Sequence, residues 1–464
     1  MLKIWHKISI EKLALFAVLA LGTCFIFVFP PNSAPDEAVH FASAYQNASA
    51  VLGETSPDVS MMTIREADKK LLTEYSNYPD RHTYEYFSEE LFKPIPPDEM
   101  KTVEITRGTG VPYPYIYAPQ TIGVLLGRII NANPEWLYLL GRIFNLIFYA
   151  VCVWLAVKLT PIGKGVLAIV ALFPMAMELA ASHNPDTFST AFAFIAIAQY
   201  LRIAYGDGPT RALDLWLLLA TMLAMGPPKV IFFPILMLLF FMPTKCFAEK
   251  KYAVIFRIIV AVSTIVVLSL TLYLFMSRGG DGTPIVTRPG EVIYSVSDLL
   301  ADPILFAKMC KRTLEMGIGY FLFSMMGTDL GWIEIQVPEV LVWIILVFVV
   351  LAAFKEKDED LDIKSRDKIQ FVIIFFLAAL GTAVTMFLLW TPVGSWKIEG
   401  IQGRYYLPVF PLLILALARW KQLPSRPTWL SDKNLILYVC LLEILILIFA
   451  HSFIAGREPV HLVA

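Results

Sequence analysis

The sequence predicts an all-α polytopic membrane protein, and its composition and hydropathy carry this prediction. The chain has 464 residues, of which 57% are hydrophobic and only 17% are charged. Its mean hydropathy is +0.64. Soluble domains are closer to half apolar and a quarter charged. Eleven apolar segments approach the roughly 20 residues that a helix needs to cross the hydrocarbon, where unpaired backbone groups find no partner.

The charge balance and the cysteines exclude several classes of function. The formal net charge is -1 and no long block of Lys or Arg is present, so we expect no nucleic-acid partner. The five cysteines are scattered, mostly within apolar runs, and form neither a disulfide framework nor a CxxC metal pair.

The first apolar run, 13–30, follows the basic segment 1–12. A signal peptide is the competing interpretation, because "NSA" resembles a cleavage site. The run is longer than the usual core of a signal peptide and prolines crowd the candidate site, which favours a retained transmembrane helix. The predicted spans are 13–30, 134–157, 165–182, 187–204, 212–226, 230–243, 253–276, 338–354, 369–390, 405–418 and 434–452.

The basic residues orient these spans. Short segments between alternate spans hold more than half of the chain's Lys and Arg, which is typical of cytoplasmic loops. The N-terminus is then cytoplasmic, the C-terminus lies outside, and polar outer stretches lie at 31–133, 277–337 and 391–404. No internal repeat is visible, so residues 1–464 are expected to form a single multi-pass domain in the cytoplasmic membrane.

The segments 212–226 and 230–243 allow two interpretations. Each is short for a full crossing, and "GPPK" joins them. One kinked helix would place the basic cluster at 245–257 outside, against the positive-inside rule, so two short helices are expected. Short, proline-interrupted spans often line functional cavities.

The first outer stretch, 31–133, is too long for an idle connector. Its pattern predicts short helices at 36–52 and 62–76. The tract "VPYPYIYAPQTIGVLLGRII" ends in an apolar helical half, which is too short and interrupted for a span and suits a helix lying on the outer membrane surface.

Asp36, Glu37 and His40 follow the first span, and helical spacing brings the three side chains to one side of the helix at 36–52. Three roles are open for the acids. In the first, the acids cap the N-terminus of the helix and interact favourably with the helix dipole. Alternatively, one of them is a general base at the outer edge of the membrane. A third role is a site for a divalent metal (Mg or Mn), for which a second acid–histidine pair is lacking.

Other polar and aromatic residues are expected on the same outer side. Tyr113 and Tyr115 anchor the chain at the membrane interface or stack against a sugar ring. His183, Asn184 and Asp186 form a tight turn between two spans, either as an ordinary polar turn or as part of an outer cavity.

Asp329 and Trp332 lie just before the span 338–354, in a solvated connection or a loop that folds over a site.

Basic residues expected on the same outer side are candidates for binding a phosphate group. Gln402, Arg404 and Tyr405 lie where the chain re-enters the membrane. An interfacial arginine often snorkels to the headgroups, but its planar fork also matches phosphate oxygens in pairs. Lys229, between the two short helices, adds a second positive charge. The sequence therefore predicts one outer site that combines Asp36 with Arg404 and Lys229.

Five short stretches occur in the same order as in one known protein family: "APDEAVHFASAYQ", "YPYIYAPQTIGVLLGR", "HNPD", "GPPK" and "IQGRYYLPVFPLL". From about residue 13 to about residue 420 the chain resembles a bacterial family of multispanning membrane proteins, a domain of unknown function grouped with the GT-C glycosyltransferases. The resemblance implies a GT-C-like helical bundle, a sugar donor carried on polyprenyl phosphate, and an acid early in the first outer loop that acts as base or binds a metal. By position that acid is Asp36, with Glu37 beside it.

One function is expected, with two alternatives. The expected function is an inverting glycosyltransferase that moves a sugar from a polyprenyl phosphate to a cell-envelope glycan or lipid on the outer face of the membrane. Asp36 is the expected base, Glu37 its support or a metal contact, and Arg404 with Lys229 the phosphate site. Further substrate contacts are expected from His40, Tyr113, Tyr115, His183, Asn184, Asp186, Asp329, Trp332, Gln402 and Tyr405. The alternatives are a flippase or transporter of lipid-linked saccharides, which needs ionisable groups near the bilayer midplane, and a non-catalytic partner in polysaccharide assembly.

Overall fold

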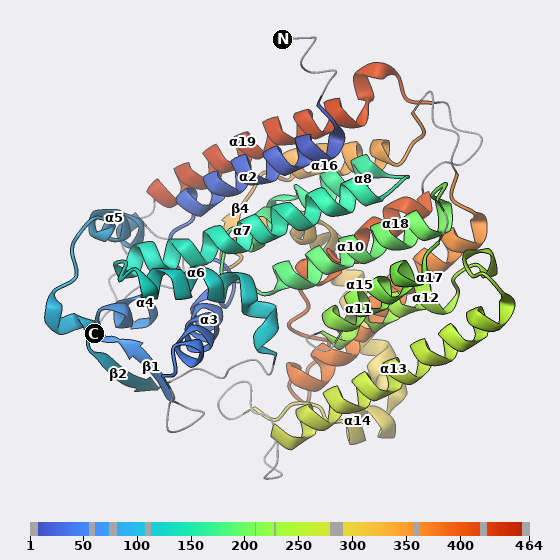
Figure 1. Cartoon of the computed structure of the whole chain (residues 1–464). Coiled ribbons are helices and arrows are strands. Elements are labelled where there is room, and N and C mark those ends of the chain that lie inside the picture. The colour runs from blue at the N-terminus through green and yellow to red at the C-terminus, as the bar shows by residue number, and fades with distance from the viewer. Residues whose placement is uncertain are drawn as a thin grey trace.

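The structure is a computed structural model, and it describes residues 8–54, 61–73, 81–106, 113–208, 210–226, 229–278, 291–356, 362–417 and 425–456. The described part is mostly helical, with two small antiparallel sheets of two strands each. Segments from both ends of the chain lie side by side, because α2 (Ile10–Val28) runs along α19 (Asp432–Gly456) (Figure 1).

Among the described residues, six helices are long and apolar enough to cross a membrane. The helix α7 (Pro134–Leu159) packs against both α2 and α10 (Asp186–Tyr205). Small residues allow these contacts: a Cβ on Gly22 would lie 2.2 Å from the side chain of Leu146, so α2 approaches α7 closely at this point. The six helices are α2, α7, α10, α13 (Lys250–Arg278), α17 (Ser365–Leu389) and α19.

The predicted number of eleven spans is matched only in part. Six predicted spans correspond to the six long helices, and three correspond to shorter apolar helices. These three predicted spans are 212–226, 230–243 and 338–354, the last of which is α16 (Glu339–Ala352).

The two remaining predicted spans, 165–182 and 405–418, are interrupted. Pro174 divides the first, because it has no N–H with which to continue the hydrogen-bond ladder of a helix. In the second, a 3-10 turn takes the place of the first α-helical turns. The resulting elements are α8 (Lys164–Ala171), α9 (Pro174–Ala180), η6 (Gly403–Tyr406) and α18 (Phe410–Leu417).

The region of the two short predicted helices is not a continuous α-helix. The helix α11 (Ala212–Met225) ends first, and the chain then forms the 3-10 helix η4 (Val230–Leu236) and the short α12 (Met237–Phe240). Pro234 lies inside η4, where its missing N–H disfavours an α-helical ladder. Three elements, α11, η4 and α12, therefore occupy this region, and no single kinked α-helix runs through its described residues.

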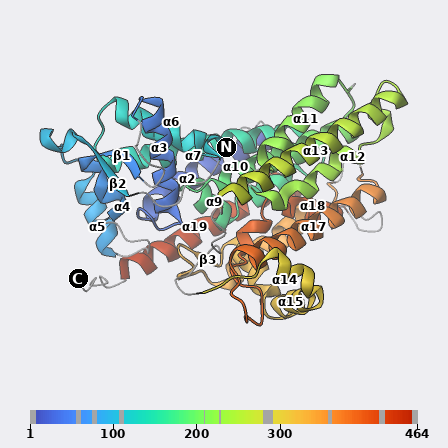
Figure 2. The same cartoon turned by 90° about the horizontal axis from the view of Figure 1, so that it is seen from below.

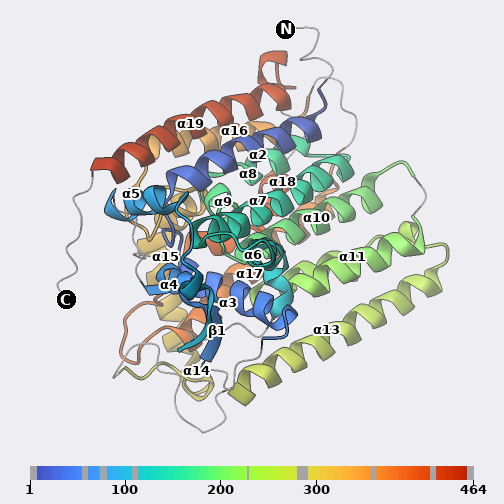
Figure 3. The same ribbon diagram turned by 60° about the vertical axis from the view of Figure 1, so that its left-hand side comes forward.

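The stretch 31–133, predicted to lie outside, contains more than helices. The helix α3 (Glu37–Val51) matches the prediction for 36–52, but the helix predicted at 62–76 is wrong over its first half. Residues Met61–Arg65 form β1, which pairs antiparallel with β2 (Thr102–Thr106). Figure 3 shows β1 beside α3 and α4 at one end of the bundle. The remaining elements are η1 (Glu66–Lys69), α4 (Lys70–Thr73), α5 (Arg81–Glu90) and η2 (Pro97–Met100).

The aromatic tract forms η3 (Pro114–Tyr117) and α6 (Ala118–Ile129). Glycine lets α6 lie against α7, since a Cβ on Gly123 would be 2.3 Å from the carbonyl oxygen of Leu140. The other side of α6 exposes Ile122 and Ile129. The helix is thus held by the bundle along one side and presents apolar side chains along the other.

The polar stretch predicted at 277–337 contains a long helix. After α14 (Val296–Ala301), the helix α15 (Pro303–Met326) has 24 residues. Both helices lie beside α17 (Figure 2). The segment before α14 joins the stretch at 391–404, because the Tyr294 N–H donates to the Thr391 carbonyl oxygen at 3.1 Å. A second hydrophobic core lies between these segments and is formed by Tyr294, Met309, Phe387, Ile398 and Ile401. A small hairpin of β3 (Asp329–Leu330) and β4 (Ile335–Gln336) follows α15.

The long helices fix which loops share one end of the bundle. Tyr205, in the last turn of α10, donates a hydrogen bond to Asp367, in the first turn of α17. The helix α17 therefore begins where α10 ends and leads to the stretch at 391–404, and Arg404 in η6 reaches Asp186 at the start of α10. The candidate site lies at this end.

Candidate functional site

The loop between α2 and α3 holds Asp36 in a fixed position. Asp36 directly precedes α3 and has a φ of 59°, in the left-handed region that residues other than glycine rarely adopt. Asn32, with the same φ, is anchored on α7 by Tyr138. The Asn32 N–H donates to the Tyr138 hydroxyl oxygen, and that hydroxyl donates to Asn32 Oδ1, both at 2.9 Å. The surrounding contacts thus support a strained loop that ends in a carboxylate.

Glu37 points away from Asp36 and into the bundle. Its carboxylate is fully buried and accepts hydrogen bonds from Arg142 Nε at 2.8 Å and Nη2 at 2.7 Å. The His183 N–H donates to the same carboxylate at 3.1 Å. Burial alone would raise the pKa of Glu37, but the Arg142 guanidinium brings that pKa below its usual value. The expectation that Glu37 supports a base or contacts a metal does not fit this geometry, in which Glu37 anchors the loop to α7.

Asp36, Asp186, Lys229 and Arg404 form one charged cluster. Arg404 Nη2 lies 3.5 Å from Asp36 Oδ2, and Arg404 Nε lies 3.8 Å from Asp186 Oδ2. The other carboxylate oxygen of Asp186 pairs with the Lys229 ammonium. The structure therefore brings together the two predicted phosphate-binding cations and two acids, from segments almost 370 residues apart in the chain.

Arg404 is buried but incompletely bonded. Its side chain is only 5% exposed, whereas the side chain of Asp36 is 53% exposed. The atoms Nε and Nη1 of Arg404 have no hydrogen-bond partner among the described residues. Burying N–H groups of a guanidinium without hydrogen bonds costs free energy, so these nitrogens are suited to oxygens of a bound anion.

The preceding glycine explains how Arg404 is buried. A Cβ on Gly403 would lie 2.3 Å from the Met325 nitrogen and 2.4 Å from the Phe321 oxygen, so η6 lies directly against the backbone of α15. The aromatic ring of Tyr405 lies close to both cations. The Arg404 Cζ lies 5.6 Å and the Lys229 Nζ 4.9 Å from the centre of this ring, within the range of cation–π attraction.

His40 lies at the edge of this cluster and is neutral at ordinary pH. Burial lowers the pKa of its imidazole to about 4; Asp186 and Asp36 oppose this shift and Arg404 adds to it. The ring nitrogen Nδ1 lies 2.9 Å from the hydroxyl of Tyr117. His40 can therefore exchange hydrogen bonds with a neutral group without adding charge to the cluster.

Tyr113 and Tyr115 form an aromatic edge beside the start of α10. Their rings meet edge to face at 6.1 Å, and Tyr115 packs in the same manner on Phe188 at 5.7 Å. The Tyr115 hydroxyl donates to the carbonyl oxygen of Ala224 at 2.9 Å, near the end of α11. Tyr115 thus links η3 to the end of α11.

His183 and Asn184 position the site rather than face it. His183 is fully buried, and its Nε2 lies 3.1 Å from the Tyr138 carbonyl oxygen. Asn184 Nδ2 donates to the Pro35 carbonyl oxygen at 3.3 Å, and Asn184 Oδ1 accepts from the Asp186 N–H at 2.9 Å. One asparagine thus links the residue before Asp36 to the backbone of Asp186.

The remaining predicted substrate contacts lie around the cluster. The Trp332 indole N–H donates to the Asn32 carbonyl oxygen at 3.2 Å and joins the β3–β4 hairpin to the loop before α3. The side chain of Asp329 accepts a hydrogen bond from the Thr328 hydroxyl at 2.7 Å. Gln402 is half-buried and directly precedes η6. Trp332 and Gln402 carry no charge, and Asp329 forms no ion pair with Arg404 among the described contacts. None of the three is therefore part of the charged cluster.

The residues present do not fit a divalent cation. Both oxygens of Glu37 are engaged by N–H groups of Arg142, which leaves Asp36 without the predicted second carboxylate. Asp36 and Asp186 are separated by the Arg404 guanidinium, which pairs with both. Within the described part of the chain, no group of three or more His, Cys, Asp or Glu side chains is arranged to hold a metal ion.

A family model described as "Predicted membrane protein (DUF2142)" matches residues 19–413. The chain belongs to this family. With its long apolar helices, this DUF2142 member is a multi-pass membrane protein. No curated protein and no solved structure matches the chain. The matched region includes Asp36, Asp186, Lys229 and Arg404, so the whole charged cluster lies within the part that defines the family.

Two partners in this DUF2142 site were not predicted from the sequence. Arg142 lies inside a predicted span, and a charge at that depth calls for a partner, which here is Glu37. The position of Arg142 in the sequence thus indicates that it needs an acidic partner but does not identify which acid that is. Tyr117, the partner of His40, gave no signal beyond its place in an aromatic tract.

Proposed function

We propose that this protein is an inverting glycosyltransferase of the GT-C type in the bacterial cytoplasmic membrane. It moves a sugar from a polyprenyl phosphate to a cell-envelope glycan or lipid on the outer face. One observation carries the proposal: the buried, incompletely bonded guanidinium of Arg404 lies 3.5 Å from the half-exposed carboxylate of Asp36. Transfer from a lipid phosphate needs a cation for the departing phosphate and a base for the incoming hydroxyl.

Arg404 and Lys229 bind the phosphate of the donor in this proposal. Nε and Nη1 of Arg404 supply the donors for phosphate oxygens, and Lys229 adds a second charge. Negative charge on the phosphate grows as its bond to the sugar breaks, so these cations stabilise the transition state more than the bound donor. Asp186 balances both cations before the donor arrives.

Asp36 takes the proton of the acceptor hydroxyl. The hydroxyl oxygen forms a bond to the anomeric carbon while the bond from that carbon to the phosphate oxygen breaks, and the electron pair of the broken bond leaves with the polyprenyl phosphate. Attack from the face opposite the phosphate inverts the anomeric configuration. At 3.5 Å the contact between Arg404 and Asp36 is long for a charge-assisted hydrogen bond, so an arriving phosphate displaces Asp36 at little cost.

The proposal predicts that Asp36→Asn abolishes sugar transfer, because the amide cannot accept the proton. Purified protein in detergent is assayed with radiolabelled polyprenyl-phosphate hexoses and a crude cell-envelope acceptor fraction. Asp98→Asn, which changes an exposed acid in the same outer stretch, is the matched control and keeps full transfer.

Normal transfer by the Asp36→Asn protein removes Asp36 as the base. If the unaltered protein transfers no sugar but moves the labelled lipid across vesicle membranes, the flippase alternative replaces the enzyme.

A further inference from the structure

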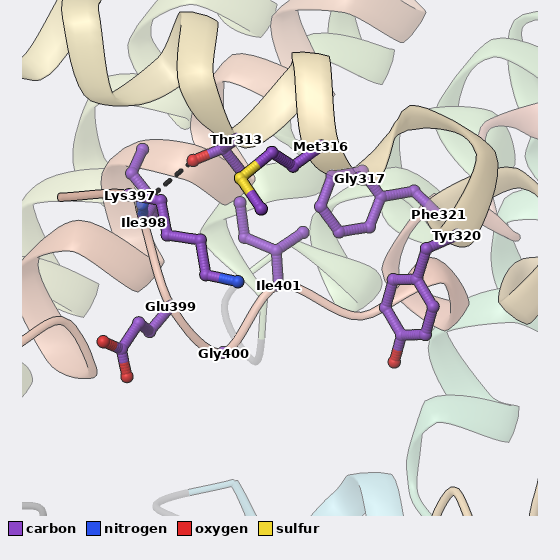
Figure 4. Close-up of a pocket in the computed structure, with 10 residues that line it drawn as sticks. All are labelled: Thr313, Met316, Gly317, Tyr320, Phe321, Lys397, Ile398, Glu399, Gly400 and Ile401. Carbon is purple, nitrogen blue, oxygen red and sulfur yellow. Dashed lines mark hydrogen bonds between the residues drawn. The ribbon is translucent and has the colours of Figure 1, made fainter. Parts of the chain in front are cut away.

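A cavity of about 530 Å³ lies between α15 and the outer stretch 397–401 (Figure 4). This volume falls in the range of sites for small molecules, roughly 300–1,000 Å³. One stripe of α15, Thr313, Met316, Gly317, Tyr320 and Phe321, forms one wall. The opposite wall is formed by Lys397, Ile398, Glu399, Gly400 and Ile401.

The cavity adjoins the charged cluster through two contacts. Phe321, which lines it, packs edge to face on Tyr406 of η6, with the ring centroids 6.2 Å apart. The last turns of α15 lie directly against Gly403, next to Arg404. The loop that forms the second wall runs straight into η6. A molecule in the cavity is therefore placed beside the site of Asp36 and Arg404.

Resting on the function proposed above, we propose that this cavity binds the acceptor as a glycan, with Tyr320, Lys397 and Glu399 as its contacts. None of the three belongs to the charged cluster. Tyr320 supplies a partly exposed ring for a sugar face, while the Lys397 ammonium donates to hydroxyl oxygens and the Glu399 carboxylate accepts from hydroxyl groups.

The chemistry of the lining favours a glycan over an isoprenoid chain. An alkyl chain would remove water from an ammonium and a carboxylate and return no hydrogen bond, which costs free energy for each charge. Sugar hydroxyls both donate and accept, so one ring can form hydrogen bonds to both Lys397 and Glu399. The apolar wall of Met316, Ile398 and Ile401 suits the C–H face of a sugar.

The test measures glycan binding directly, without sugar transfer. Fluorescently labelled full-length protein in detergent is titrated with soluble oligosaccharides released from bacterial cell-envelope polysaccharides. We expect at least one oligosaccharide to bind, and Glu399→Gln and Tyr320→Ala each to weaken this binding about tenfold, the effect of losing roughly 1.4 kcal/mol. Tyr320→Phe, which keeps the ring, retains most of the binding.

Two controls separate this site from the catalytic one and from misfolding. Glu315→Gln changes an exposed acid on α15 outside the cavity and leaves binding unchanged. Asp36→Asn also binds the glycan normally, because Asp36 acts on the hydroxyl and does not line the cavity. Thermal unfolding midpoints within a few degrees of the unaltered protein show that each variant is folded.

Three results overturn the assignment: no oligosaccharide binds, the cavity variants bind as well as Glu315→Gln, or a photoactivatable isoprenyl phosphate crosslinks to Met316 and Phe321. Glycan binding with no transfer activity in any assay leaves the cavity assignment standing and contradicts the proposed function instead.

Discussion

At the scale of single residues, the two nitrogens of Arg404 that lack a hydrogen-bond partner among the described residues decide what its replacement should do. Arg404→Ala removes both donors, and Arg404→Lys keeps the charge but loses the planar fork. Because a hydrogen bond to a charged group contributes roughly 1.5–3 kcal/mol, we expect the KM for the lipid donor to rise about 100-fold for Ala and about tenfold for Lys. Steady-state kinetics with labelled polyprenyl-phosphate hexose measure both values.

The acceptor provides the internal control for Arg404. The KM for the acceptor should stay within about twofold of the value for the unaltered protein in both variants, since of the two substrates Arg404 contacts only the donor, through its phosphate. A donor KM and a kcat that are both unchanged in Arg404→Ala would contradict the phosphate role, because the loss of a cation that acts mainly in the transition state lowers kcat. Loss of donor and acceptor binding together would show instead that Arg404 only maintains the structure.

Glu37 lies next to Asp36 in the sequence but should behave differently when replaced. Glu37→Gln leaves the Arg142 charge buried without its counter-ion, and breaking such a pair costs about 3–5 kcal/mol. We expect a large fall in the thermal unfolding midpoint, followed by intrinsic fluorescence in detergent. Arg142→Met in the same chain removes the stranded charge and should recover part of this loss.

A stable Glu37→Gln protein without transfer activity would refute this structural role and return Glu37 to the chemistry. The sequence pattern predicts both acids on one helical face, because its spacing treats Asp36 as a helical residue. Its left-handed φ of 59° breaks that periodicity and turns the two carboxylates apart. A residue pattern alone does not reveal such a φ.

At the scale of elements, the contact of η6 with α15 sets the position of Arg404. A methyl group at position 403 would meet the backbone atoms Met325 N and Phe321 O at 2.3 and 2.4 Å, and backbone has little freedom to yield. Gly403→Ala should therefore displace η6 and raise the donor KM at least tenfold, by misplacing the guanidinium.

Gly319→Ala is the matched control on α15, because a Cβ there meets nothing within 4 Å. It should keep normal kinetics and raise the unfolding midpoint slightly, since Ala favours a helix by about 1 kcal/mol over Gly. Equal effects of the two variants on donor KM would mean that close packing at Gly403 does not position Arg404.

The elements show where hydropathy predicts structure and where it does not. Long apolar runs such as those of α7 and α17 were predicted almost to their ends, because length and composition suffice for a spanning helix. The sequence wrongly predicts a helix at the strand β1, since the strand depends on its pairing with β2, which no local pattern reveals. Pro174 and the 3-10 turn η6 shortened two other predicted spans.

At the scale of the whole molecule, helix direction is what joins distant residues into one site. Asp36, Asp186 and Arg404 are expected on one side of the membrane because each follows or precedes a span whose direction the basic residues predict. That part of the site could be inferred from alternation and from the basic loops. The cavity under α15 could not, because its two walls come from segments about 80 residues apart that meet through a separate hydrophobic core.

The orientation of the bundle is the last expectation, and it can be tested on exposed positions at its two ends. Val393 lies in the stretch that leads to Arg404, and Asp207 follows the far end of α10. The distribution of Lys and Arg predicts that the Asp207 end is cytoplasmic. In a chain with its five cysteines replaced, Val393→Cys should react with a membrane-impermeant maleimide in intact cells, and Asp207→Cys only after permeabilisation. The reverse pattern would place Asp36 and Arg404 in the cytoplasm, where acceptors on the outer cell surface cannot reach them, and would eliminate the proposed reaction whatever the geometry of the site.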